Sequence, residues 1–222
     1  MTKVHDVSFV ALAALSAMLA LAGNVDAEDA PPTIVTLGDS YINSYGVAAT
    51  ETFATRLKSG LNAAGHPVTI VEVGFTATSK EGLTWLAESK DGLDLQASPA
   101  NHVVIVELGQ NDCSHYIDLD HTRANLDQIL SILAQKRVPV LVVGTAAYRK
   151  CGADYAEPFS KIFSELATKH GDLLYADFKE GVTGHRELLQ SDNDHPNAAG
   201  EAIIVRNMIP MVEALLAQVQ PR

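Results

Sequence analysis

Residues 33–40 read Thr-Ile-Val-Thr-Leu-Gly-Asp-Ser. Apolar and β-branched residues that run into a glycine are typical of a buried strand ending in a tight turn. We therefore predict a strand over Thr33–Leu37, with Ser40 just past its carboxyl end. Ligands bind at that edge of an open α/β sheet, so a serine there can act as a nucleophile. Gly-Asp-Ser alone fits a simple turn and helix N-cap as well.

Strand-like and helical patterns alternate along the rest of the chain. The segment Val103–Val106 is apolar throughout, which is typical of a strand buried on both faces. The alternation predicts an α/β fold, a three-layer α/β/α sandwich with a flavodoxin-like, five-stranded parallel sheet in the order 2-1-3-4-5. Beyond the first strand, we expect strands over 68–73, 102–108, 138–143 and 173–176, helices over 51–64, 78–89, 120–135, 155–170 and 196–218, and a loop over 109–116.

The first 27 residues have the layout of a secretory signal peptide. Lys3 and His5 precede an apolar run over 7–23, and Val25 and Ala27 are the small residues before a cleavage point. We expect cleavage after Ala27, one domain over 28–222, and a periplasmic or secreted protein without stable membrane insertion. The alternative is an uncleaved anchor, although the run is short for a membrane span.

The composition is that of an ordinary globular protein, with 47% hydrophobic and 19% charged residues among 222. The formal net charge of −11 argues against nucleic acid and anionic lipid surfaces as partners. No histidine and cysteine cluster has metal-ligand spacing, and no phosphate-binding loop is present. We expect a monomer that uses neither a metal nor another cofactor.

Asp192 and His195 lie three residues apart, just before the last predicted helix. A short turn there can let Asp192 accept a hydrogen bond from one imidazole nitrogen while the other takes the proton of Ser40. The amide of Asn111 and the backbone N–H of Ser40 can stabilise an oxyanion. The simpler alternatives are a helix-start histidine held by Asp192 and an Asx turn at Asn111. If Asp192 is only a turn residue, Asp194 is the next candidate acid.

Three motifs, at 38–40 (Gly-Asp-Ser), 109–112 (Gly-Gln-Asn-Asp) and 192–196 (Asp-x-x-His-Pro), together resemble the SGNH/GDSL hydrolase superfamily. Within it, the chain looks most like the bacterial periplasmic thioesterase I/lysophospholipase/arylesterase group. The resemblance implies that Ser40 is the nucleophile, that Asp192 and His195 complete a triad, and that Asn111 lies in the oxyanion hole.

One block departs from the family pattern. The family shows Gly-x-Ser-Gly-x-Thr after the second strand, whereas residues 74–79 here read Gly-Phe-Thr-Ala-Thr-Ser. Ala77 therefore stands where the family has a glycine whose N–H points into the oxyanion hole. A backbone N–H survives this change if the position does not require a positive φ. An alignment shifted by one residue would make Thr76 the donor instead.

The resemblance implies a serine esterase that hydrolyses acyl esters, thioesters or lysophospholipid-type substrates through an acyl-enzyme. Its partner is then a small acyl-ester or lipid-like substrate. A carbohydrate O-acetylesterase on the same scaffold is an alternative, and a non-catalytic binding module is an alternative of a different class. The intact set of Ser40, Asp192 and His195 argues against the binding module.

The chain contains two cysteines, Cys113 and Cys151, which fit one disulfide in an exported protein. Cys113 follows the strand over 102–108, and Cys151 lies in the loop after the strand over 138–143. Neighbouring parallel strands bring both loops to the same edge, where the two cysteines can, but need not, come within bridging distance. The bond would tether the loop that carries Asn111; the alternative is a pair of free thiols.

Overall fold

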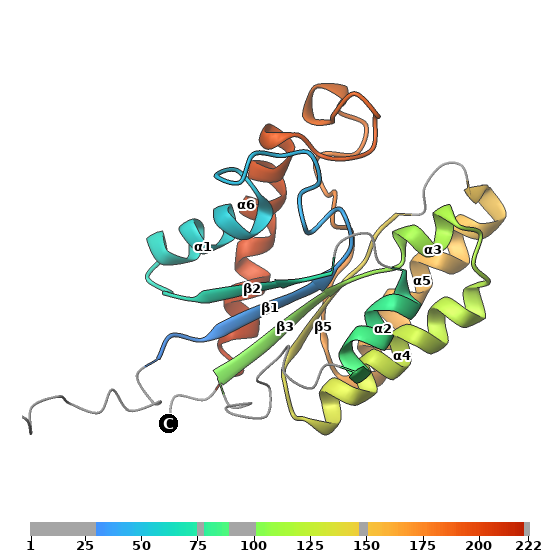
Figure 1. Ribbon diagram of the computed structural model, residues 1–222, viewed down its shortest axis with the longest axis horizontal. Coiled ribbons are helices and arrows are strands. Elements are labelled where there is room, and N and C mark those ends of the chain that lie inside the picture. The colour runs from blue at the N-terminus through green and yellow to red at the C-terminus, as the bar shows by residue number, and fades with distance from the viewer. Residues whose placement is uncertain (1–29, 75–77, 89–100, 147–150, 220–222) are drawn as a thin grey trace, which may run out of the picture. The chain divides into compact units, whose positions relative to one another are not determined.

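The computed structural model describes residues 30–74, 78–88, 101–146 and 151–219. Its parallel sheet has five strands in the order β2-β1-β3-β4-β5, which confirms the predicted fold class and strand order (Figure 1). The strands are β1 Thr33–Gly38, β2 Thr69–Val73, β3 His102–Glu107, β4 Val140–Val143 and β5 Leu173–Tyr175. The helices are α1 Phe53–Ala63, α2 Ser79–Glu88, α3 Gln110–Ser114, α4 Leu119–Gln135, α5 Ala153–His170, the 3₁₀ helix η3 Arg186–Leu188 and α6 Ala198–Leu216.

Helices cover both faces of the sheet because successive strand residues point to opposite sides. Val104 and Val106 of β3 belong to one buried cluster, which includes residues of α2, α4 and α5. Val103 and Ile105 belong to a second cluster, with residues of α1 and α6. Figure 1 shows these two helical layers on either side of the strands. The central strands are therefore apolar on both faces, as the run at 103–106 predicts.

Strand register brings the first two predicted motifs together. Gly38 at the end of β1 pairs with Glu107 at the end of β3, so the turn that carries Ser40 and the segment after β3 leave the same edge. A side chain on Gly38 would collide with Ile42 and come within 2.7 Å of the Glu107 carbonyl oxygen. Gly38 therefore allows the backbone to approach closely at this edge.

The segment after β3 differs from the prediction of a loop over 109–116, because Gln110–Ser114 forms the short helix α3. After Gln110, its residues Asn, Asp, Cys and Ser are weak helix formers, which is why the sequence pattern predicts a loop. Tertiary contacts outweigh that weakness: buried Asp112 accepts hydrogen bonds from the Ser79 N–H at 2.7 Å and from the Thr122 hydroxyl at 2.9 Å. These bonds tie α3 to the starts of α2 and α4.

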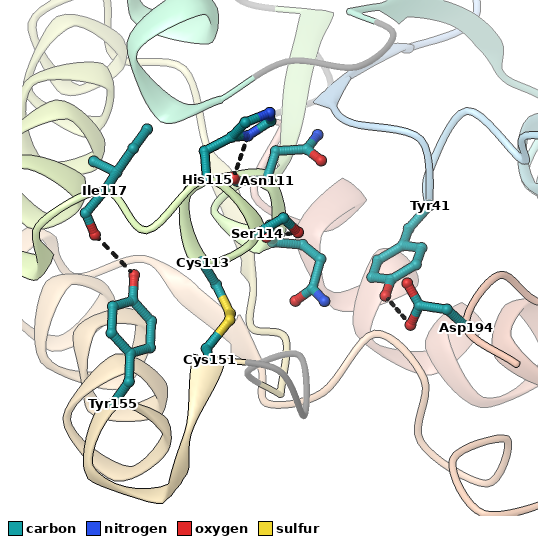
Figure 2. The surroundings of a disulfide bond; sticks show 10 residues. Tyr41, Asn111, Cys113, Ser114, His115, Ile117, Cys151, Tyr155 and Asp194 are labelled. Atoms are coloured by element: carbon teal, nitrogen blue, oxygen red, sulfur yellow. Dashed lines mark hydrogen bonds between the residues drawn. A yellow bond between two sulfur atoms is a disulfide. The ribbon is translucent and has the colours of Figure 1, made fainter. Parts of the chain in front are cut away.

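Cys113 of α3 forms a disulfide with Cys151, which precedes α5, and the two Cα atoms lie 5.9 Å apart (Figure 2). The predicted pairing is thus present in the structure. Asn111 lies on the same short helix as Cys113. The disulfide therefore fixes the helix that carries the predicted oxyanion donor.

We expect reduction of this disulfide to lower both the thermal midpoint and the rate of ester hydrolysis that the sequence predicts. The cysteines are 38 residues apart, and chain entropy for such a loop gives at most about 4 kcal/mol of stabilisation. Activity should fall because α3 loosens. The measurement compares melting curves and hydrolysis rates with and without reductant, with a Cys113→Ala/Cys151→Ala variant as the control for reductant effects. An unchanged midpoint after complete reduction would contradict the prediction.

Among the helices in the described ranges, none is long and apolar enough to cross a membrane. The predicted signal peptide, residues 1–27, lies outside the described residues.

Candidate active site

Ser40 lies in the turn directly after β1, and its hydroxyl oxygen is 3.0 Å from Nε2 of His195. The side-chain amide of Asn43 donates to the carbonyl oxygens of Gly38 at 3.3 Å and Asp39 at 2.7 Å. The Tyr41 N–H donates to the Asp39 carboxylate at 3.0 Å. These bonds hold the turn, so that Ser40 projects from a fixed position beyond the strand.

His195 and Asp192 lie on the loop before α6. Nδ1 of His195 is 2.7 Å from Oδ2 of Asp192, while Oδ1 accepts the backbone N–H groups of Asp194 at 3.0 Å and His195 at 3.1 Å. Asn193 has a φ of 61°, a left-handed conformation that asparagine tolerates better than most residues and that makes this turn tight. The loop thus brings both Asp192 oxygens onto the residue that faces Ser40.

The Asp192 carboxylate is held in its ionised form. Burial raises its pKa, but the hydrogen bonds from Asp194 and His195 outweigh that effect and hold the pKa below its usual value. An ionised carboxylate can only accept, so Nδ1 of His195 carries the proton and donates it. Nε2 is then left to accept the hydroxyl proton of Ser40.

The remaining predicted residues divide into two groups. Asn111 lies in α3, on the segment that follows β3 at the same edge of the sheet as Ser40. Ala77 and its alternative Thr76 lie outside the described residues. Asp194 does not take the place of Asp192, because its carboxylate is bonded to Tyr41 and Lys179.

A buried carboxyl pair beneath Ser40 was not singled out from the sequence. Asp39 and Glu107 are 1% and 0% exposed. Burial raises the pKa of Asp39 to about 6, against lowering by the Tyr41 N–H and Glu107. Burial and the charge of Asp39 raise the pKa of Glu107 well above its usual range. Glu107 therefore favours its protonated form, and its Oε2 accepts the backbone N–H of Asp39 at 3.5 Å, at the base of the turn.

Because folding raises both pKa values, the folded state binds more protons than the unfolded chain. The contribution of this pair to stability is complete below the unfolded pKa, near 4, and is lost as the pH rises through the folded values. We expect Glu107→Gln, which mimics the protonated acid, to lose less stability than the wild type between about pH 5 and pH 9. Denaturant unfolding across that range checks this, with Glu165→Gln on the surface as the matched control; parallel curves would contradict it.

Two further residues near the site, Tyr41 and Lys179, were also missed. The Tyr41 ring packs edge-on against the His195 ring, with 5.4 Å between ring centres. Lys179 is only 9% exposed and donates to the Tyr41 hydroxyl at 2.8 Å. Burial and the nearby Asp194 charge raise the pKa of Tyr41 far above its usual range, so its hydroxyl stays protonated. A lysine in a loop gives no sequence signal of burial, because most lysines are exposed.

Comparisons with known proteins identify the family of the chain. A sequence profile of the GDSL-like Lipase/Acylhydrolase family matches residues 36–203. The chain is 29% identical over 192 residues to esterase TesA of Pseudomonas aeruginosa, covering 84% of this chain and 90% of that protein. It is 27% identical over 188 residues to an Escherichia coli K12 protein named thioesterase 1/protease 1/lysophospholipase L1, covering 84% and 86%.

Among solved structures, the crystal structure of TesA matches with a TM-score of 0.74 at 26% identity, covering 82% of this chain and 99% of that chain. The family profile spans all three motifs from the Gly-Asp-Ser turn to the Asp-x-x-His loop. The protein therefore belongs to the GDSL-like lipase/acylhydrolase family and is a carboxylic ester hydrolase.

Proposed function

We propose that the protein is a serine esterase in which Ser40 is the nucleophile, His195 the general base and Asp192 the residue that orients His195. The observation that carries this proposal is the continuous line of hydrogen bonds from Ser40 Oγ to His195 Nε2, at 3.0 Å, and from His195 Nδ1 to Asp192, at 2.7 Å. This is the arrangement that a Ser-His-Asp triad requires.

The reaction follows from this arrangement. Ser40 Oγ attacks the acyl carbonyl carbon while Nε2 of His195 takes the hydroxyl proton. Asp192 stabilises the imidazolium that forms. The tetrahedral intermediate then expels the alcohol or thiol, which takes the proton from His195 and leaves the acyl group on Ser40. Water, deprotonated by Nε2 of His195, attacks this ester; the second tetrahedral intermediate then collapses, His195 returns the proton to Ser40 Oγ, and the carboxylic acid is released.

The oxyanion of the tetrahedral intermediate needs donors that are already in place. We propose that these are the Asn111 amide, the Ser40 N–H and the N–H of Ala77. The position of Asn111 on α3 supports its role, since α3 is held by the disulfide and by the contacts of Asp112. The role of Ala77 rests on its alignment with the glycine of the family motif.

We expect Asn111→Ala to lower kcat by about 10²–10³-fold, with little change in KM, because one oxyanion donor is lost. Steady-state kinetics on p-nitrophenyl butyrate checks this. Asn125→Ala, at a polar position of α4 on the Ser79–Asp112 network, controls for general loosening of the region. An effect confined to KM would instead make Asn111 a substrate-binding residue.

We propose small acyl esters and thioesters, with lysophospholipid-type esters among them, as the substrate class. The names of the two relatives, an esterase and a thioesterase/lysophospholipase, support this breadth. We also propose that residues 1–27 direct export to the periplasm and are removed, which leaves one hydrolase domain over 28–222. The disulfide supports export, because disulfides persist in oxidising compartments.

A fluorophosphonate probe tests the proposed function. We expect one probe molecule on the native protein, at Ser40 by peptide mass mapping, together with complete loss of activity. Heat-denatured protein and Ser40→Ala should remain unlabelled. A native protein that hydrolyses esters but carries the probe elsewhere, or not at all, would contradict the proposal.

A further inference from the structure

Tyr41, which follows Ser40, is hydrogen-bonded to Asp194, which precedes His195. The Tyr41 hydroxyl donates to Oδ1 of Asp194 at 2.6 Å (Figure 2). This bond runs beside the 3.0 Å contact between Ser40 and His195. Two adjacent hydrogen bonds therefore join segments that lie more than 150 residues apart in the chain. One joins Ser40 to His195, and the other joins Tyr41 to Asp194.

Lys179, in the turn after β5, closes this second link into a triangle. Its Nζ donates to the Tyr41 hydroxyl and to Asp194 Oδ1, both at 2.8 Å, and to the Asp194 carbonyl oxygen at 3.3 Å. The ammonium group has three protons, and these three acceptors use them all. A buried ammonium and a carboxylate thus pair with each other, and the tyrosine hydroxyl both accepts from one and donates to the other.

The triangle touches the catalytic base through the Tyr41 ring. That ring packs edge-on against His195 and lies parallel to Phe178, with 5.9 Å between ring centres on the Phe178 side. Lys179 Nζ is 4.3 Å from the centre of the same ring. A shift of the Tyr41 hydroxyl would therefore move the surface against which the imidazole rests.

We propose that Tyr41, Asp194 and Lys179 form a charge-balanced clamp that positions His195 against Ser40. The inference rests on the proposed function, because the clamp acts only through the triad. These three are positioning residues, since none of them touches the reacting atoms. The clamp holds the loop between η3 and α6 against the turn after β1. The hydrogen-bonding distance between Ser40 and His195 is therefore already set before substrate binds.

The balance of charge gives the clamp a signature that a merely structural contact would lack. Both charges lie near the imidazole: Asp194 Oδ1 and Lys179 Nζ are both hydrogen-bonded to the hydroxyl of Tyr41, whose ring packs edge-on against His195. Lys179 Nζ is 4.3 Å from the centre of that ring. In the intact clamp the two charges offset each other. Removing either one leaves the other uncompensated beside His195 and changes the pH at which the base becomes protonated.

Substitution of Lys179 and substitution of Asp194 should shift the acidic limb of the kcat/KM profile in opposite directions. Lys179→Met leaves a carboxylate that favours the imidazolium, so the acidic limb of the kcat/KM profile should move up by about half a pH unit to one pH unit. Asp194→Asn leaves an ammonium that disfavours the imidazolium, so the limb should move down by about the same amount. The double variant should return close to the wild-type limb.

The other titratable residues that face this site are the same in the wild type and in every variant. They are Asp192 on the same loop, Asp39 in the turn after β1, and Tyr45, whose ring centre is 5.2 Å from that of His195. None of them is changed in the variants, so the opposed shifts report only the clamp.

The experiment measures kcat and KM for p-nitrophenyl butyrate from pH 5 to pH 9 for Tyr41→Phe, Lys179→Met, Asp194→Asn and the double variant. Active sites are counted with the fluorophosphonate probe, so that unfolded protein does not enter kcat. Tyr41→Phe keeps the ring but removes the hydroxyl, and should lower kcat by about three- to thirtyfold at unchanged KM. Lys161→Met, from an exposed pair with Glu157, is the matched control and should leave kcat and the profile unchanged.

Opposed shifts of the two single variants, with recovery in the double variant, would support the clamp. Shifts in the same direction, or an unmoved limb with kcat within twofold of wild type, would overturn it. If Lys179→Met does not fold, Tyr41→Phe and Asp194→Asn, which preserve side-chain shape, give the answer. A lowered kcat in Tyr41→Phe with a downward shift of the limb in Asp194→Asn would support the clamp, whereas kcat within twofold of wild type or a limb that does not move down would overturn it. Ser40→Ala, measured alongside, separates the two proposals: residual activity there contradicts the triad itself, whereas an inactive Ser40→Ala with unaffected clamp variants contradicts the clamp alone.

Discussion

Ser40→Ala is expected to lower kcat for p-nitrophenyl acetate by about 10⁴–10⁶-fold, because loss of a triad nucleophile removes the acyl-enzyme route altogether. The fold should survive, since the Ser40 side chain bonds to His195 and the turn is held by Asn43 and by the Asp39 carboxylate instead. Circular dichroism and the thermal midpoint check that the variant is folded before its rate is measured.

The matched control for this substitution is Ser164→Ala. Ser164 lies on α5, where its hydroxyl donates to the Lys161 carbonyl oxygen on an exposed helix face. This variant should keep the wild-type rate. If Ser40→Ala kept a tenth of the wild-type kcat, the nucleophile would be misassigned.

Asp192→Asn is expected to lower kcat by about 10³–10⁴-fold, with little effect on KM. The amide oxygen can still accept the N–H groups of Asp194 and His195, as Oδ1 does now, so the turn should keep its shape. What is lost is the second acceptor, which holds the proton on Nδ1 of His195 and stabilises the imidazolium. Steady-state kinetics with active-site titration measures this loss.

Asp194→Asn provides the comparison within the same loop. Asp194 is bonded to Tyr41 and Lys179, so its substitution should cost at most about tenfold in kcat. Equal rates for Asp192→Asn and the wild type would reduce Asp192 to a turn residue. A larger loss of kcat in Asp194→Asn than in Asp192→Asn would mean that Asp194, and not Asp192, is the acid of the triad.

Local patterns were sufficient to predict the fold. The apolar run of β3 predicted a strand buried on both faces, and the alternation of strands with helices predicted the order 2-1-3-4-5. The same order placed Cys113 and Cys151 on neighbouring loops, where the structure bonds them. The proximity of Ser40, His195 and Asp192 was also expected, because parallel strands bring their carboxyl ends to one edge.

Contacts that depend on burial could not be predicted in this way. Glu107 ends an apolar strand and Lys179 lies in a loop, and neither shows from sequence whether it is solvated or enclosed. Their roles arise from partners far away in the chain, Asp39 for Glu107 and Tyr41 for Lys179. Helix α3 was missed for the same reason, since its stability comes from the contacts of Asp112 rather than from helix propensity.

The most direct test of the nucleophile is to trap the acyl-enzyme. Protein mixed with excess p-nitrophenyl butyrate is quenched in acid during turnover, digested and analysed by peptide mass mapping. We predict one butyryl group on the peptide that contains Ser40, a group that is absent from Ser40→Ala and lost when the native enzyme is left to turn over. Butyryl on another residue, or hydrolysis with no acylated peptide under conditions in which deacylation is rate-limiting, would contradict the assignment of Ser40.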